Sequence, residues 1–134
     1  MSLTLTIPIR TKTGLNSREH PLARKRRVEG ERAAVALALR GKPLPAAEHF
    51  PVVVELVRIS PRLADSDNAI GGLKSVRDQI ATALGVDDGD QVRVRWLYRQ
   101  EKGPFGVRVT IHERSRIETR IVPVTDLVNC RWGV

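Results

Sequence analysis

The chain has 134 residues, which is the size of one domain built around a single hydrophobic core. Its 41% apolar and 28% charged residues are typical of a globular protein and argue against a disordered or membrane-spanning chain. The net charge of +8 favours a polyanionic partner, with nucleic acid ahead of an anionic membrane.

Two features of the sequence bear on cellular location. Cys130 is the only cysteine, so no disulfide can form within the chain. Residues 1–4 lack the charged and apolar segments of an export signal. We therefore expect a cytoplasmic protein. We expect no membrane partner, because residues 22–40, the one segment able to form a basic amphipathic anchor, carry mostly Ala where bulky apolar residues would be needed.

The N-terminal residues predict an edge strand and then a polar loop. Residues 2–9 alternate apolar and polar side chains, and Pro8 lacks the N–H that an interior strand requires. Residues 10–20 form the loop, for which a solvated surface is the alternative interpretation. Side chains of the kind that contact phosphates occur along it, at Arg10, Lys12, Asn16, Arg18 and His20.

A basic helix is predicted next, from Pro21 to about Arg40. This stretch is rich in Ala, Leu, Arg and Glu, and Gly41 and Pro43 supply a stop signal. Its first half carries the densest basic run in the chain, which indicates a phosphate-facing surface or, alternatively, a solvated helix face. The run consists of Arg24, Lys25, Arg26 and Arg27.

The middle of the chain predicts a central strand and a second helix. Residues 51–59 are β-branched and mostly apolar, and Ser60-Pro61 ends the strand. Residues 68 to about 84 carry apolar side chains at helical spacing. Gly71-Gly72 is costly inside a helix, so it indicates either the close approach of another group or a later helix start near Leu73.

Two further strands follow, at residues 91–98 and 105–111, joined by a turn at Gly103-Pro104. Their polar faces carry arginines with scarcely an acidic residue between them, which favours DNA contact over the alternative of a solvated surface. These arginines are Arg93, Arg95 and Arg99 on the first strand and Arg108 on the second.

Together these elements predict an α+β fold with a mixed sheet of about four strands and two main helices, in the order β-α-β-α-β-β. We expect a single domain over residues 1–134. Residues 113–134 form a C-terminal extension, in which residues 117–124 have the pattern of one more strand.

Acidic residues gather in the middle of this otherwise basic chain. Residues 51–90 carry four Lys and Arg against seven Asp and Glu, a net charge of −3, whereas residues 1–50 and 91–134 carry +6 and +5. Two carboxylates about 4 Å apart repel by roughly 4 kcal/mol at an effective dielectric constant of about 20, so grouping them is costly without a cation. Oxygen ligands alone point to Mg²⁺ or Mn²⁺.

The acidic residues fit phosphodiester hydrolysis. In extended backbone, Asp65 and Asp67 would point to the same side and could hold a metal that activates water. On one continuous helix, Lys74 would lie about 10 Å from Asp67 on nearly the same face, within partial reach of a phosphate. Structural roles are the alternative: Asp67 or Asn68 can cap the helix, and Lys74 can pair with Asp78.

Three segments in this order resemble the RusA family of Holliday junction resolvases, in particular its phage-borne and prophage-borne relatives. The resemblance covers about Leu15 to His112 and includes a similar Asn- and Arg-rich loop at residues 15–20. The segments are Asp65-x-Asp67-Asn68, Leu73-Lys74-x-Val76-Arg77-Asp78 and Leu84-Gly85-Val86-Asp87-Asp88-Gly89-Asp90.

Members of this family are homodimeric, Mg²⁺-dependent endonucleases that nick four-way DNA junctions with paired cuts. The resemblance implies that Asp65, Asp67 and Asp88 bind the metal and that Lys74 is the essential lysine. Asp87 ranks below Asp88, and Mn²⁺ is expected to substitute for Mg²⁺. The DNA-binding residues that we expect are Asn16, Arg18, Arg24, Lys25, Arg26, Arg27, Arg93 and Arg95.

The sequence thus predicts a Mg²⁺-dependent endodeoxyribonuclease that resolves Holliday junctions by paired nicking in DNA recombination and repair. We expect a homodimer, because symmetric partners suit a substrate with paired strands. Two alternatives stay open. One is a basic nucleic-acid-binding protein without catalysis, and the other is a nuclease that acts on different branched DNA, such as flaps or forks.

Overall fold

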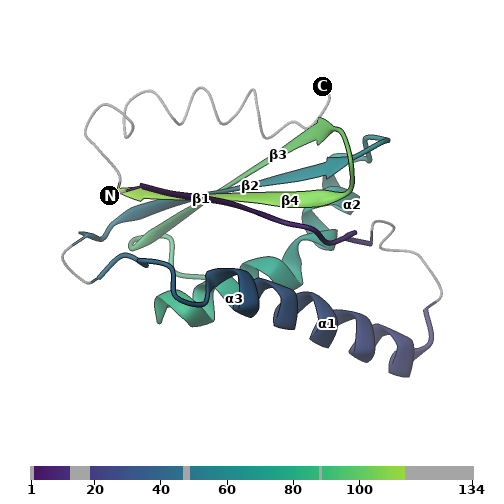
Figure 1. Ribbon diagram of the computed structural model, residues 1–134, viewed down its shortest axis with the longest axis horizontal. Helices are drawn as coiled ribbons and strands as arrows, with labels where there is room; N and C mark the ends of the chain where they lie inside the picture. Colours follow the sequence, from purple (N-terminus) through teal and green to yellow (C-terminus); the bar gives the residue numbers. More distant parts are fainter. Residues whose placement is uncertain (1, 13–18, 47–48, 88, 114–134) are drawn as a thin grey trace.

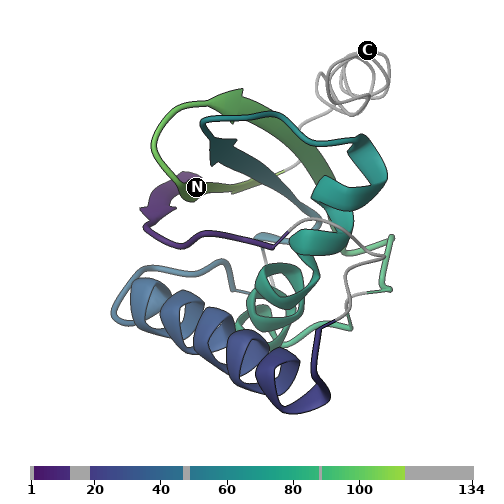
Figure 2. The same ribbon diagram turned by 90° about the vertical axis from the view of Figure 1, so that its right-hand side faces the viewer.

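The strands form one mixed sheet, and the two longer helices lie on one side of it (Figures 1 and 2). The computed structural model describes residues 2–12, 19–46, 49–87 and 89–113. Within these ranges the α+β class and the four-stranded mixed sheet are confirmed. The strand pattern at residues 117–124 and the C-terminal extension from residue 114 onward lie outside the described residues.

The sheet has the order β1-β4-β2-β3. Its strands are β1 (Ser2–Ile7), β2 (Val52–Ser60), β3 (Val94–Lys102) and β4 (Gly106–Glu113). β2 lies in the interior, parallel to β3 and antiparallel to β4, as its continuous apolar run predicts. β1 pairs only with β4 and ends at Ile7, directly before Pro8, so the expected edge strand is confirmed.

The first helix, α1 (Pro21–Leu39), has the bounds that its composition predicts. Pro21 occupies the first helical position, and the His20 Nδ1 atom accepts a hydrogen bond from the backbone N–H of Leu22 at 3.1 Å. Gly41 follows the helix with φ +74°, a left-handed conformation that glycine adopts without strain.

The second predicted helix is two helices, α2 (Ser66–Gly72) and α3 (Lys74–Leu84). The expectation of one continuous helix is wrong. The break is at Leu73 (φ −93°, ψ 0°), whose side chain is fully buried. Two consecutive glycines weaken the helix directly before this point, so the alternative of a later helix start describes α3. Gly85 ends α3 with φ +72°, a left-handed conformation.

The hydrophobic core lies between the sheet and the helices. Val52, Val54 and Leu56 of β2 point toward the helices and are fully buried. Val35 of α1 and the α3 residues Val76 and Ile80 are buried against the same core. Within the part of the chain that the structure describes, no helix is both long and apolar enough to cross a membrane.

Candidate active site

The acidic segment follows the C-terminal end of the central strand. β2 ends at Ser60, residues 61–64 form a short connection, and Asp65 directly precedes α2. Asp67 lies in the first turn of that helix, and both aspartate side chains are exposed. The expectation that Asp65 and Asp67 share extended backbone is wrong, because helical backbone begins at Ser66.

A glutamine from β3 holds this connection in place. The Gln100 Oε1 atom accepts a hydrogen bond from the Ala64 backbone N–H at 2.9 Å, and Gln100 Nε2 donates to the Ala64 carbonyl at 2.8 Å. Gln100 Oε1 also accepts from Arg58 Nη1 at 2.9 Å. Our sequence analysis missed Gln100. The available signal was a polar residue on the same strand face as Val94, Trp96 and Tyr98.

The carboxylates of Asp65 and Asp67 differ from most other described carboxylates in their lack of partners. Neither makes a hydrogen bond or ion pair with any described residue, and Asp65, which occupies the cap position of α2, forms no side-chain cap bond. The alternative that Asp67 or Asn68 caps the helix is wrong, because the helix begins at Ser66 and Asp65 occupies the cap position. By contrast, Asp78 and Asp90 are bound by Lys74 and Arg93. Asp65 and Asp67 are open to a cation.

The second acidic segment lies before β3. Asp87 Oδ1 accepts a hydrogen bond from the Gly89 N–H at 2.9 Å. Asp90 accepts from the backbone N–H groups of Val92 and Arg93 and from Arg93 Nε at 2.6 Å. The backbone N–H of Arg93, followed by its guanidinium, lowers the pKa of Asp90. Asp88 lies outside the described residues, although its neighbours on both sides are described.

The parallel pairing of β2 and β3 separates the two acidic segments. Where these strands begin, Val52 N–H donates to the Arg93 carbonyl at 2.9 Å. Near their ends, Ala64 is bonded to Gln100. A rise of about 3.3 Å per residue puts these two points roughly 20 Å apart. Figure 1 agrees, with α2 near the end of β2 and the end of α3 near the start of β3.

Asp65 and Asp67 after β2 therefore do not form one cluster with Asp87 and Asp90, the described acidic residues of the second segment. Among the residues that the structure describes, no group of three or more His, Cys, Asp or Glu side chains could hold a metal. The expected convergence of three aspartates within one chain finds no support here, because the helices between the segments carry the chain from one end of the sheet to the other.

Lys74 is the first residue of α3 and is 70% exposed. Its ammonium lies 3.3 Å from Asp78, which is the pairing that we considered as the alternative. The argument that Lys74 and Asp67 share one helix face is wrong, because the break at Leu73 puts them on different helices.

The basic run on α1 is partly neutralised. Arg27 pairs with Glu19 at 3.1 Å and with Glu31 at 3.3 Å, and Arg24 lies 3.8 Å from Glu19. The hydrogen bond from Arg27 lowers the pKa of Glu19. Lys25 and Arg26 are exposed and have no ion-pair partner among the described residues. The other two predicted contacts, Asn16 and Arg18, lie outside those residues.

The arginines of the sheet have acidic partners that we did not expect. Arg93 is bound by Asp90. On the sheet face turned away from the helices, Arg99 lies 3.4 Å from both Glu55 and Glu101, and Arg108 pairs with Glu101. The statement that scarcely an acid accompanies these arginines is wrong, because Glu55 and Glu101 reach the same face from β2 and β3. Arg95 lies on this face as well.

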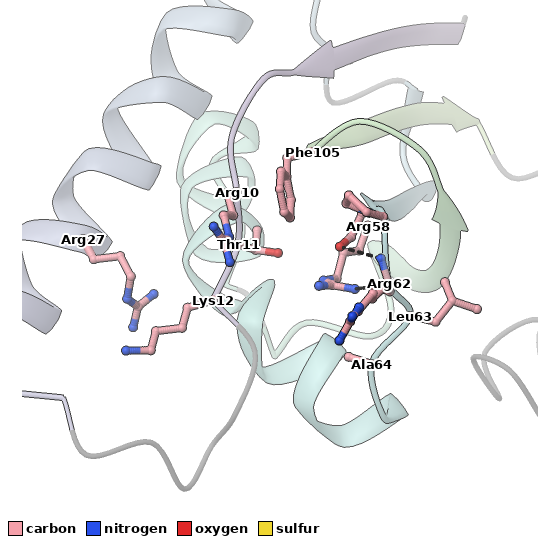
Figure 3. Close-up of a pocket in the computed structure, with 11 residues that line it drawn as sticks. Arg10, Thr11, Lys12, Arg27, Arg58, Arg62, Leu63, Ala64 and Phe105 are labelled. Carbon is pink, nitrogen blue, oxygen red and sulfur yellow. Dashed lines mark hydrogen bonds between the residues drawn. The ribbon is translucent and has the colours of Figure 1, made fainter.

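A basic hollow lies beside the connection to Asp65 (Figure 3). Its volume is about 780 Å³, and it is bounded by the segment after β1, by α1, and by the end of β2 with the residues that follow. Five lining side chains are cationic and no described lining residue is acidic. The lining residues are Arg10, Thr11, Lys12, Arg27, Arg58, Ser60, Pro61, Arg62, Leu63, Ala64 and Phe105.

Comparison with known proteins does not identify a family or a function for this site. No protein-family model matches the chain, and no curated protein is significantly similar to it.

Proposed function

We propose that this protein is a RusA-like, Mg²⁺-dependent endodeoxyribonuclease that nicks four-way DNA junctions in the cytoplasm. One observation carries the proposal. Asp65 and Asp67 are two carboxylates without protein partners among the described residues, and they lie one and three residues after Ala64, a lining residue of the basic hollow. Free carboxylates beside clustered cations are the two components that metal-assisted cleavage of a phosphodiester requires.

Two carboxylates are enough to fit the metal. Mg²⁺ commonly takes one or two protein carboxylates and completes its octahedral shell with waters and substrate phosphates. Asp65 and Asp67 would hold the ion, and Mn²⁺, which also prefers oxygen ligands, would substitute. When bound, the ion supplies an activated water and neutralises charge on the phosphate and the leaving oxygen.

The basic residues would reduce the electrostatic repulsion between the DNA phosphates and these carboxylates. A phosphate about 4 Å from a carboxylate is repelled by roughly 4 kcal/mol at an effective dielectric constant of about 20. Arg10, Arg58 and Arg62 offset that repulsion from the hollow. Lys25 and Arg26, which are exposed on α1, extend the positive surface beyond it. Lys74 keeps its proposed role as the family lysine.

A third carboxylate, if the reaction uses one, comes in this proposal from a second copy of the chain. The resemblance assigns that role to Asp88, whereas the described neighbour Asp87 belongs to the other end of the sheet. A homodimer in which Asp88 of one copy approaches Asp65 and Asp67 of the other reconciles the two observations. Such a dimer also matches the paired strands of a junction.

Nicking of a synthetic four-way junction tests the proposal. The full chain is expected to nick the junction with Mg²⁺ or Mn²⁺ and to stop when EDTA is added. Asp65→Asn and Asp67→Asn should each lower the nicking rate by about a hundredfold or more, since each removes a metal-binding charge. Glu29→Gln, which also removes an exposed carboxylate without a described partner, is the matched control and should nick normally. Unchanged activity of Asp67→Asn would remove this mechanism.

The separation of the acidic segments favours one rival, a basic nucleic-acid-binding protein without catalysis. That protein would bind DNA strongly at low salt and lose affinity steeply as salt rises, as expected for phosphate contacts. It would cut no branched DNA with any divalent metal. Binding without nicking, in the same preparation, decides for the rival.

A further inference from the structure

Arg58 is a buried cation without an anionic partner among the residues that the structure describes. Its side chain is 6% exposed, and no carboxylate in the described part of the chain pairs with it. Nη1 donates to two neutral oxygens, the Arg62 carbonyl at 3.2 Å and Gln100 Oε1 at 2.9 Å. The Nε atom is buried and has no hydrogen-bond partner. Buried charges in proteins are normally paired, so this arginine needs a further explanation.

A second cation lies near Arg58 and increases the cost of burying it. Arg10 follows β1, and its guanidinium carbon lies 4.6 Å from the centre of the Phe105 ring. Burial and then the charge of Arg10 lower the pKa of Arg58. Arginine stays protonated in proteins, so two positive charges face each other here without an acid to separate them. Figure 3 shows Arg10 and Arg58 on facing sides of the hollow.

The contrast with Arg27 shows that the protein can neutralise a cation in this hollow. Arg27 lines the same space, and Glu19 and Glu31 bind it. Glu19 also lies 3.5 Å from Lys12. The outer side of the hollow is therefore balanced, whereas Arg10 and Arg58 at its inner side and the exposed Arg62 at its entrance have no acidic partner among the described residues.

Small polar groups complete the inner side. Ser60 is 3% exposed, and its Oγ atom accepts a hydrogen bond from the Arg62 N–H at 3.4 Å. Thr11 is 6% exposed and also lines the hollow. Hydroxyls next to arginines are suited to bind an oxyanion, because an arginine fork and O–H donors match the oxygens of a phosphate.

We propose that the hollow is a phosphate-binding site in which Arg58 and Arg10 bind a single phosphate group, with Arg62 at the entrance. The anion supplies the negative charge that Arg58 lacks among the described residues. That the phosphate belongs to a DNA backbone rests on the proposed function, whereas the anion site itself does not. In that setting, the bound group is a phosphate near the scissile one, since the hollow extends to Ala64, directly before Asp65.

Metal-free full-length protein, treated with EDTA and titrated with inorganic phosphate, provides the test. Phosphate should raise the Tm of the wild type in a saturable manner, and chloride at equal ionic strength should not. Arg58→Gln and Arg10→Gln should abolish this rise. Arg40→Gln is the matched control, because it removes one exposed charge at the far end of α1 and should leave the rise intact. An equal rise in wild type and Arg58→Gln overturns the site, as does no rise in wild type.

The Tm without phosphate provides a second readout. Replacing an uncompensated buried charge by a neutral side chain should leave the Tm of Arg58→Gln equal to that of the wild type or higher. If Arg58 were purely structural, Arg58→Gln would have a lower Tm than the wild type. The proposal is contradicted if Arg58→Gln has this lower Tm and Arg10→Gln binds phosphate normally.

Junction DNA, measured by fluorescence anisotropy in Ca²⁺, identifies the source of the phosphate. Arg58→Gln should weaken DNA binding by about tenfold to a hundredfold, the range for a lost charged hydrogen bond, and more than Arg40→Gln does. If the natural ligand is a free phosphate ion, Arg58→Gln would leave the DNA affinity unchanged.

The phosphate site and the nuclease activity can fail independently. Nicking without phosphate binding would contradict only the phosphate site. Phosphate binding without nicking would contradict only the proposed nuclease activity.

Discussion

Gln100 on β3 binds both backbone polar groups of Ala64, accepting from its N–H at 2.9 Å and donating to its carbonyl at 2.8 Å. Ala64 is the residue before Asp65, so a strand side chain sets the position of the first acidic residue. The same glutamine accepts from Arg58 Nη1. One side chain therefore links the proposed metal-binding aspartates to the proposed phosphate site.

Replacing Gln100 by Ala should lower both the stability of the fold and the nicking rate. The change leaves two backbone groups of Ala64 without their partner, which costs about 1–3 kcal/mol. Displacing Asp65 by about 1 Å should lower the nicking rate by up to about a hundredfold. Urea unfolding and junction nicking measure the two effects. Gln91→Ala, at an exposed position in the turn before β3, is the control and should change neither. Normal nicking by Gln100→Ala would mean that the connection holds Asp65 without this contact.

The break between α2 and α3 depends on Leu73. Its side chain is fully buried, and it lies among the core residues between the sheet and α3. Leu73→Ala should lower the free energy of unfolding by about 2–5 kcal/mol, because it removes buried methyl groups and leaves a cavity. Leu37→Ala makes the same chemical change at a position that is 69% exposed, and it should cost less than about 1 kcal/mol. Equal losses in the two variants would show that Leu73 is not a core residue.

The ion pairs on the outer sheet face predict a pH dependence of stability. The hydrogen bond from Arg108 holds the pKa of Glu101 below its ordinary value of 4.5. The folded protein therefore releases this proton more readily than the unfolded chain does. Glu101 contributes stability above pH 4.5, and that contribution is lost as the pH falls through the lowered folded-state pKa.

Glu101→Gln should accordingly lower the Tm at pH 7, and the difference from wild type should shrink on acidification below about pH 4.5. Glu29→Gln is again the control, since Glu29 has no ion-pair partner among the described residues, and it should lower the Tm at pH 7 less than Glu101→Gln does. A Tm difference for Glu101→Gln that is constant from pH 7 to pH 3 would contradict the assignment.

Local sequence patterns predicted most of the fold. Alternation identified β1, the apolar run identified β2 as an interior strand, and the turn at Gly103-Pro104 identified β4 as the partner that follows β3. These signals are strong because each depends on neighbouring residues alone. The start of β3 was predicted three residues too early, because the Asp90 carboxylate binds the N–H groups of Val92 and Arg93 and holds them in a turn.

The site was harder to predict, because it depends on contacts between distant segments. Sequence spacing could not show that parallel strands separate Asp87 from Asp65, or that Glu55 and Glu101 neutralise Arg99. Arg58 had a readable signal: it continues the strand face of Val54 and Leu56, where a cation is out of place. A charge on a core-facing position therefore indicates a buried site.

The proposed origin of the third carboxylate predicts complementation between inactive variants. If Asp88 acts on the site of a second copy, Asp67→Asn and Asp88→Asn are each inactive alone. A refolded equal mixture regains about a quarter of the wild-type sites, because half of the dimers are mixed and each mixed dimer contains one intact site. Single-strand nicking of the junction measures this recovery, and Asp65→Asn mixed with Asp67→Asn is the control that stays inactive. A mixture that also stays inactive would argue that Asp88 acts with Asp65 and Asp67 of its own chain, and the trans arrangement proposed here would be wrong.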